Sequence, residues 1–246
     1  MAPAGAGYRS NRERMPTVLK SRAIAVLGLL VAALLGMLYA GYRHDIREAR
    51  QRISTGSEIV QTPCGPIEYA AAGEGAPVLV VHGAGGGYDQ LLEFSDVLVA
   101  SGFRIIAMSR FGYLRTPLPS DASASAQADA HACLLVALGI RRAAVVGVSA
   151  GAPSSMQFAL RHPDRCSAMV LLVPAVYVPR PGGGPPIEAP PGTRFLFDTA
   201  LKFDLLFWFA TSFARTTAIR GILATPPELV ENASAAEQAR IDKVLK

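Results

Sequence analysis

The sequence predicts an α/β protein with a mostly parallel sheet, preceded by one transmembrane helix. Two patterns support this prediction. Between residues 58 and 175, short and continuous apolar runs alternate with longer stretches of helical character. Such runs are typical of parallel strands that helices cover on both faces, and the crossovers between them are expected to be right-handed. In addition, an uncharged apolar run occupies residues 23–40.

The composition excludes two broad classes of protein. Half of the residues are hydrophobic and only 17% are charged, which is incompatible with a disordered chain and sufficient for a large core. The net charge is +5, but the basic residues are dispersed apart from a concentration beside the apolar run. No basic patch or known motif is present, so we expect no nucleic-acid partner.

The N-terminal region predicts a single-pass membrane anchor. Residues 1–22 form a basic tail, residues 23–42 the transmembrane segment, and residues 43–57 a charged juxtamembrane helix. At 1.5 Å per residue, the apolar run spans about 27 Å, close to the hydrocarbon thickness of a bilayer. A cleaved signal peptide is the competing interpretation, but Leu38-Tyr39-Ala40 offers only half of a small-x-small cleavage site.

Basic residues predict the orientation of this anchor. Lys and Arg are slightly more frequent before the apolar run than directly after it. The positive-inside rule then places the N-terminus in the cytoplasm and the folded domain outside.

The predicted core covers residues 58–175 and contains six strands and three helical stretches. The strands are SEIVQT, PIEYAAAG, APVLVVHG, FRIIAMS, AAVVGVS and AMVLLVPA, and the helical stretches are 87–100, 123–138 and 150–161. Residues 176–246 then predict a loop rich in Pro and Gly, followed by helical segments at 193–223 and 227–246. The first of these segments is rich in aromatic residues, which either line a pocket or pack the helices onto the core.

The cysteines carry little information. Cys64, Cys133 and Cys166 are odd in number, and their spacing matches no zinc motif, so no metal site is expected. We expect free, partly buried thiols, with a Cys64–Cys166 disulfide as the alternative for an exported domain.

The strongest chemical signal is Gly147-Val148-Ser149-Ala150-Gly151. This G-x-S-x-G motif directly follows a strand and opens a helix, which is the setting of a nucleophilic serine on a tight turn. The residues around the serine are small, as that turn requires. Its position at a helix N-terminus favours a developing oxyanion.

A second signal is the glycine-rich segment His82-Gly83-Ala84-Gly85-Gly86-Gly87, which follows another strand. A phosphate-binding loop is the rival interpretation, but the segment has neither a Walker lysine nor the G-x-G-x-x-G register. Together with the serine turn, an oxyanion-hole loop explains the segment better.

With Ser109-Arg110-Phe111-Gly112-Tyr113-Leu114-Arg115-Thr116 as a third motif, the chain resembles the α/β-hydrolase superfamily, in its cap-bearing serine-hydrolase branch. The resemblance covers roughly residues 58–175. It implies that Ser149 is the nucleophile and that the backbone N–H groups of Ala84 and Ala150 form the oxyanion hole. It further implies supporting roles for the neighbouring motif residues: His82, Gly83, Gly85, Gly147, Gly151 and Arg110.

The chain departs from the family pattern after the serine. The triad order in this fold is Ser, then Asp or Glu, then His. The one later histidine is His162, thirteen residues on, which puts it about 20 Å from Ser149 along a helix. No carboxylate follows the sixth strand directly. We therefore expect this chain to lack the catalytic acid and base as well as the last strands, to stop inside the cap, and to be inactive by itself.

These expectations combine into one functional hypothesis. The chain is the front part of a membrane-anchored serine hydrolase, acting without a cofactor on a small ester, amide or related acyl substrate. C–C-bond hydrolysis and cofactor-free haloperoxidase chemistry share the same triad and stay open. The alternative is a non-catalytic, α/β-hydrolase-like binding module or pseudoenzyme.

Overall fold

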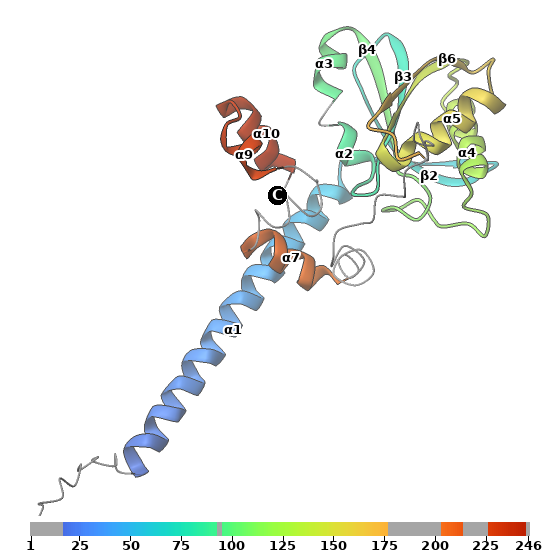
Figure 1. Cartoon of the computed structure of the whole chain (residues 1–246). Coiled ribbons are helices and arrows are strands. Elements are labelled where there is room, and N and C mark those ends of the chain that lie inside the picture. Colours follow the sequence, from blue (N-terminus) through green and yellow to red (C-terminus); the bar gives the residue numbers. More distant parts are fainter. Residues whose placement is uncertain (1–16, 93–94, 177–202, 214–225, 245–246) are drawn as a thin grey trace, which may run out of the picture. The chain divides into compact units, whose positions relative to one another are not determined.

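The structure is a computed structural model and describes residues 17–92, 95–176, 203–213 and 226–244 (Figure 1). Two compact units are distinguished, Met1–Glu48 and Ala49–Lys246. The first consists largely of helix α1 (Thr17–Ser54), whose last residues belong to the second.

Helix α1 runs without a break through the apolar segment and the charged segment that follows it. Its apolar side chains are exposed, with Ile24 at 70% and Leu29 at 72%. From Ile24 onward the helix is long and apolar enough to cross a membrane, although a signal sequence near an N-terminus has the same properties.

The second unit contains a mixed, mostly parallel sheet, as the sequence predicts. Its strand order within the described residues is β1-β2-β4-β3-β5-β6. The pairs β3–β4, β3–β5 and β5–β6 are parallel, whereas β2 is antiparallel to both β1 and β4. The strands are β1 (Glu58–Thr62), β2 (Gly65–Ala72), β3 (Ala76–Val81), β4 (Phe103–Met108), β5 (Ala143–Val148) and β6 (Cys166–Leu172).

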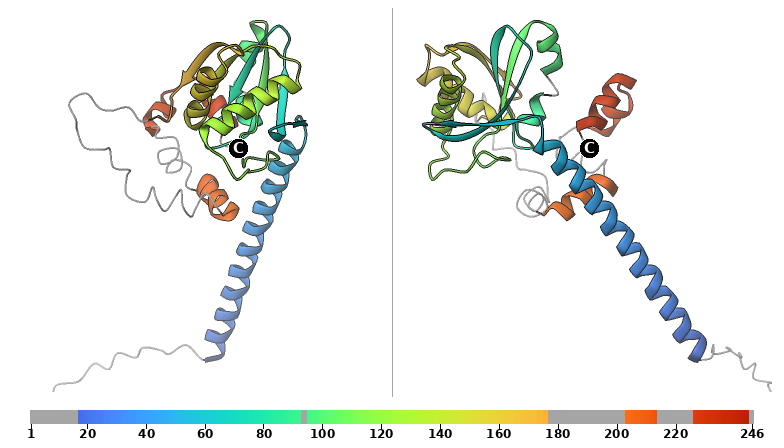
Figure 2. Two further views of the ribbon diagram at one scale, coloured as in Figure 1. Left: turned by 90° about the vertical axis from the view of Figure 1, so that its right-hand side faces the viewer. Right: turned by 180° about the vertical axis from the view of Figure 1, so that it is seen from behind.

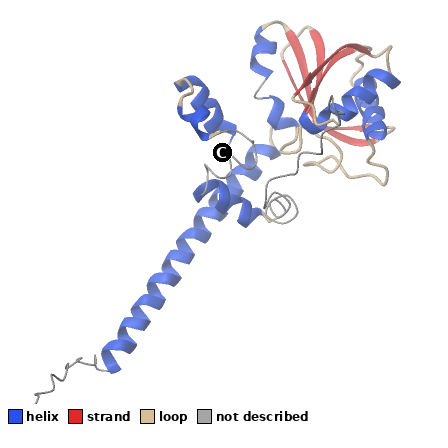
Figure 3. Ribbon diagram, in the orientation of Figure 1, coloured by secondary structure: helices blue, strands red, loops and turns tan. Residues whose placement is uncertain are grey.

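Helices cover both faces of this sheet (Figures 2 and 3). On one face lie α4 (Ala124–Ala137) and α5 (Ala152–Arg161), and on the other α2 (Tyr88–Leu92) and α3 (Asp96–Ala100). Successive side chains of β3 accordingly enter different clusters. Leu79 and Val81 pack in the cluster that contains α4 and α5, while Val78 and Val80 pack in the cluster on the α3 side. Burial on both faces explains why β3 is apolar throughout.

Two sequence-based expectations for helices need refinement. The stretch predicted as one helix over 87–100 forms two short helices, α2 and α3, with residues 93–94 outside the described part. In the predicted cap, the described elements are α7 (Asp204–Phe213), α9 (Pro227–Glu231) and α10 (Ala235–Val244). The remainder of the cap prediction lies outside the described residues.

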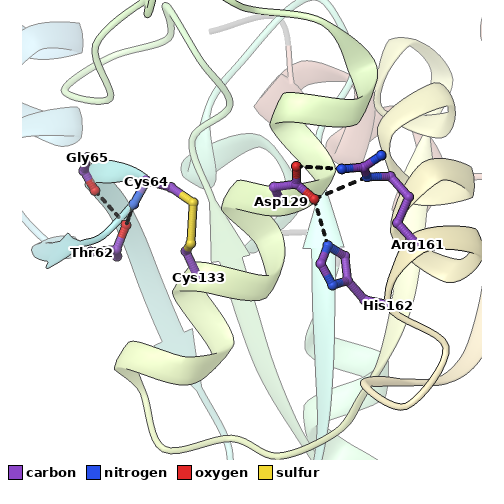
Figure 4. The surroundings of a disulfide bond; sticks show 7 residues. All are labelled: Thr62, Cys64, Gly65, Asp129, Cys133, Arg161 and His162. Carbon is purple, nitrogen blue, oxygen red and sulfur yellow. Dashed lines mark hydrogen bonds and ion pairs between the residues drawn. A yellow bond between two sulfur atoms is a disulfide. The ribbon is translucent and has the colours of Figure 1, made fainter.

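The expectation of free thiols at all three cysteines was wrong. Cys64 and Cys133 form a disulfide, with their Cα atoms 6.1 Å apart, and Cys166 is free (Figure 4). The bond joins the β1–β2 turn to α4, two elements that are far apart in sequence. Spacing along the chain does not reveal this pairing, because only the folded path brings α4 against the first hairpin.

Candidate active site

Ser149 occupies the turn between β5 and α5. It begins the short 3₁₀ segment Ser149–Gly151 that leads into the helix, and its φ is +47°. A residue with a side chain pays about 1–2 kcal/mol for a left-handed backbone. Such strain clusters at functional sites, because the surrounding structure must hold the residue in place. The turn leaves the Ser149 side chain half-exposed.

The glycines around Ser149 permit close approach of neighbouring elements. A Cβ at Gly147 would lie 2.5 Å from the Ser155 hydroxyl oxygen. One at Gly151 would lie 2.7 Å from the carbonyl oxygen of His82 and against that of Val81. Because neither glycine carries a Cβ, the serine turn can lie directly against the carboxyl end of β3.

The glycine-rich loop after β3 lies beside Ser149. A Cβ at Gly83 would be 3.2 Å from the Ser149 Cβ and 3.7 Å from its Oγ. Ala84 and Gly85, the next two residues, are exposed. The two segments that the resemblance implicates, residues 82–87 and 147–151, therefore meet in space.

His82 and Arg110 fix the peptide plane between Gly83 and Ala84. The Gly83 carbonyl oxygen lies 2.7 Å from His82 Nδ1 and accepts a 3.4 Å hydrogen bond from Arg110 Nη1. In a trans peptide, the C=O and the following N–H point in opposite directions. Holding the Gly83 oxygen therefore aims the Ala84 N–H the other way. The Tyr113 hydroxyl, which donates to the Ala84 carbonyl over 3.2 Å, orients the next peptide.

The second expected oxyanion donor is the N–H of Ala150. Ala150 lies in the first turn of the helical segment that opens at Ser149. The first N–H groups of a helix have no partner within the helix, and they carry the positive end of its dipole. This N–H can therefore bind a developing negative charge.

The backbone of His82 lies near the Ser149 turn in space, but the His82 ring cannot accept the serine proton. Nε2 of His82 accepts a 2.9 Å hydrogen bond from the Arg110 backbone N–H, which leaves the ring proton on Nδ1 facing Gly83 O. Both ring nitrogens are thus occupied. Burial lowers the pKa of His82 to about 4, so the ring is neutral at pH 7.

The other three histidines also have partners away from Ser149. Buried His131 contacts the Met108 sulfur through Nδ1 at 2.9 Å and Ser154 through Nε2 at 3.1 Å, and burial lowers its pKa to about 3. His162 follows the far end of α5 and bonds Asp129 over 2.8 Å (Figure 4). His44 lies in α1, in the other unit, beside Glu48.

A buried polar cluster behind the glycine-rich loop was not predicted from the sequence. Its centre is Glu68 on β2, whose side chain is fully buried and which bonds Ser57, Ser109 and Arg115. A signal was present, because a lone carboxylate in an otherwise apolar strand is seldom buried without a partner. Its partners were not predictable, since they lie 11 to 47 residues away.

The chain matches the family model described as alpha/beta hydrolase fold over residues 76–215. Among curated proteins, it is 35% identical over 115 residues to the uncharacterized hydrolase YcgS of Bacillus subtilis, covering 46% of this chain and 40% of the relative. It is also 35% identical over 144 residues to a 2-hydroxy-6-oxononadienedioate/2-hydroxy-6-oxononatrienedioate hydrolase of Paraburkholderia xenovorans. That match covers 54% of this chain and 48% of the relative, so the chain spans about half the length of these relatives or less.

Solved structures agree with this assignment. An alpha/beta hydrolase fold protein from Nakamurella multipartita has a TM-score of 0.51 at 32% identity, covering 68% of this chain and 56% of that protein. A membrane phospholipase A has a TM-score of 0.50 at 27% identity, covering 65% of this chain and 54% of that protein. Serine turn, glycine-rich loop, sheet order and family match all lead to the same conclusion: the chain belongs to the alpha/beta-hydrolase family.

Proposed function

We propose that this chain carries the nucleophile and the oxyanion hole of a membrane-anchored serine hydrolase, with Ser149 as the nucleophile. The observation that carries the proposal is the strained backbone of Ser149, held against Gly83 at the end of β3. A strained serine directly beside a glycine-rich loop does not improve packing, and such strain is typical of functional sites.

The reaction is acyl transfer. Ser149 Oγ attacks the carbonyl carbon of the substrate, and the N–H groups of Ala84 and Ala150 stabilise the oxyanion that forms. The serine proton passes to a base and then to the leaving group, whose bond to the carbonyl carbon breaks, so that the acyl group stays on Ser149 as the acyl-enzyme. Water then attacks the acyl-enzyme and releases the acid, restoring Ser149.

The base in this proposal is none of the chain's four histidines, because each has other partners. The proposed reaction therefore needs a proton acceptor other than these four side chains. In a serine protease, losing either the serine or the histidine costs about a million-fold in turnover. The presence of this base is consequently the largest single determinant of activity.

The substrate in this proposal is a small or medium ester, amide or related acyl compound. Named relatives include a hydrolase of dienedioate compounds and a membrane phospholipase A. These proteins share with the chain the fold and the aligned part of the core. That similarity indicates the type of reaction more than the substrate.

Covalent labelling by a fluorophosphonate tests the proposal. In this reaction the Ser149 oxygen bonds to phosphorus, fluoride leaves, and the serine proton passes to the base. We expect native membranes, which hold the full chain together with any partner that supplies the base, to show a labelled band, with the adduct on Ser149 in the peptide map. Ser149→Ala should abolish the label, whereas Ser101→Ala, at an exposed serine, should retain it.

A second candidate is a non-catalytic binding module, and one observation favours it: every histidine of the chain is engaged away from Ser149. The same labelling separates the two functions. A folded chain with an intact sheet that takes up no label contradicts the enzyme and supports the binding module.

We further propose that α1 anchors the protein and that the domain lies on the outer side of the membrane. The distribution of basic residues supports this orientation. The Cys64–Cys133 disulfide supports it independently, because disulfides persist in oxidising compartments and are rare in the cytoplasm.

Thiol counting in intact cells tests the orientation. Alkylation without reduction should modify Cys166 alone, and prior reduction should expose Cys64 and Cys133 as well. Three reactive thiols without reduction would place the domain in the cytoplasm.

A further inference from the structure

The two ends of the glycine-rich loop are held by different groups. Its beginning is fixed by His82 and Arg110, as described above. Its end, at Gly87 and Tyr88, is fixed by the buried polar cluster around Glu68. The Tyr88 backbone N–H donates to Ser109 Oγ over 3.2 Å, and Ser109 Oγ donates to Glu68 Oε2 over 2.9 Å.

The Glu68 carboxylate accepts several hydrogen bonds in addition to its ion pair with Arg115. Its carboxylate accepts hydrogen bonds from Ser57 Oγ (2.8 Å), Ser109 Oγ (2.9 Å), the Arg115 backbone N–H (3.0 Å) and Arg115 Nε (2.7 Å). Burial acts to raise the pKa of Glu68, but these hydrogen bonds hold it below its ordinary value. A buried and fully bonded carboxylate fixes the positions of all its donors.

The same cluster reaches the end of α1 and the residues that directly follow it. The Tyr88 hydroxyl donates to the carbonyl oxygen of Thr55 over 2.8 Å and also lies 3.3 Å from that of Ile53. Arg115 Nη2 donates to Ser57 O over 3.0 Å and to Ser57 Oγ over 2.6 Å. Residues 53–57 belong to the same compact unit as the loop.

We propose that Glu68 and Tyr88 are positioning residues that fix the glycine-rich loop by tying its end to residues 53–57, which are the last two residues of α1 and the three residues that follow it. Neither residue touches the reacting atoms. They act through the loop, whose Ala84 N–H must point at the oxyanion. Space at this point is tight, since a Cβ at Gly87 would lie 3.0 Å from Ser109 Oγ and against Leu114. The loop end therefore moves when Ser109 or Leu114 moves.

The expected effect on the reactivity of Ser149 rests on the proposed function, whereas the expected effect on the rigidity of the loop does not. Two readouts on the full chain, in detergent for the first and in native membranes for the second, keep them apart. The first is hydrogen–deuterium exchange of the Gly87 and Tyr88 amides, both of which are hydrogen-bonded. The second is the rate of Ser149 modification by a fluorophosphonate, resolved into its limiting rate and its half-saturating concentration.

Tyr88→Phe removes only the hydroxyl. We expect it to speed exchange at Gly87 and Tyr88 about fivefold, roughly the value of one hydrogen bond, and to leave β5 amides unchanged. The limiting rate of modification should fall by about the same factor at an unchanged half-saturating concentration. Glu68→Gln should have a larger effect of the same kind.

The matched controls come from the same hairpin. Tyr69 donates to Glu58 over 2.9 Å at the exposed edge, so Tyr69→Phe removes this Tyr–Glu bond and Glu58→Gln removes its charge, both without touching the loop. They should change neither readout. Loop exchange that is unaltered in Tyr88→Phe, or exchange that rises equally in β5, would overturn the proposal. If unsubstituted Ser149 is not labelled, the proposed function fails, and the exchange data alone decide the positioning role.

Discussion

Strands β3 and β6 are both apolar, yet their burial is opposite. In β3, Val78, Leu79, Val80 and Val81 are all at most 5% exposed. In β6, Met169, Val170 and Leu172 are 42–49% exposed. β3 lies between β4 and β5, whereas β6 pairs with β5 alone within the described residues. Apolar composition thus specifies a strand, but the neighbouring elements decide whether that strand contributes to stability.

The largest effect is expected in acid, where the buried region around β3 should lose stability because it holds two buried histidines. His82 directly follows β3, and His131 lies in α4, which covers a face of the sheet. Their pKa values in the folded state are about 4 and about 3, below the ordinary 6.5. Between these values and pH 6.5 the unfolded chain binds more protons than the folded one, so stability falls as the pH falls below 6.5.

Urea unfolding at several pH values measures this loss. Two such groups together reduce the free energy of unfolding by up to about 2.7 kcal/mol per pH unit, or about 3–4 kcal/mol between pH 7 and pH 5. His131→Leu should roughly halve the slope. A free energy of unfolding that stays constant from pH 7 to pH 5 would contradict the neutral, buried state of both rings.

Alanine substitution compares the strands directly. Leu79→Ala removes a side chain that is fully buried, and we expect a loss of about 3 kcal/mol in the free energy of unfolding. Leu172→Ala makes the same chemical change at a side chain that is 49% exposed, and should cost less than about 1 kcal/mol. Equal losses would mean that β6 is covered as completely as β3.

The disulfide ties α4, which covers one face of the sheet, to the first hairpin. The double variant Cys64→Ser/Cys133→Ser should lose about 2 kcal/mol or more, because the unfolded chain regains a long loop. Cys166→Ser, in β6, serves as the control with an intact bond and should change stability by less than about 0.5 kcal/mol.

The smallest effect on stability is expected at β6 itself. Val170→Lys places a charge on an exposed apolar edge strand, which opposes pairing with another chain. The free energy of unfolding should change by less than about 0.5 kcal/mol, while self-association by light scattering decreases. Val170→Leu provides the uncharged control. Self-association that is the same in both variants would show that β6 takes no part in it.

Much of the core was predictable because its signals are local. Short β-rich runs, most of them apolar, predicted all six strands, and the G-x-S-x-G motif between a strand and a helix placed Ser149 at the turn where the structure has it. The Cys64–Cys133 bond and the bonds of Glu68 were not predictable. They join residues that lie far apart in sequence, so they depend on the folded path and leave no periodic pattern.

The positive φ of Ser149 has a consequence for how this position responds to selection. Glycine adopts such a backbone without steric cost, so Ser149→Gly would relieve strain that Ser149→Ala retains. A chain selected for thermal stability alone would drift toward glycine here. A serine at this turn therefore records a requirement that stability does not explain, and under the proposed function a stabilised homologue with glycine at the position would be a natural inactive counterpart.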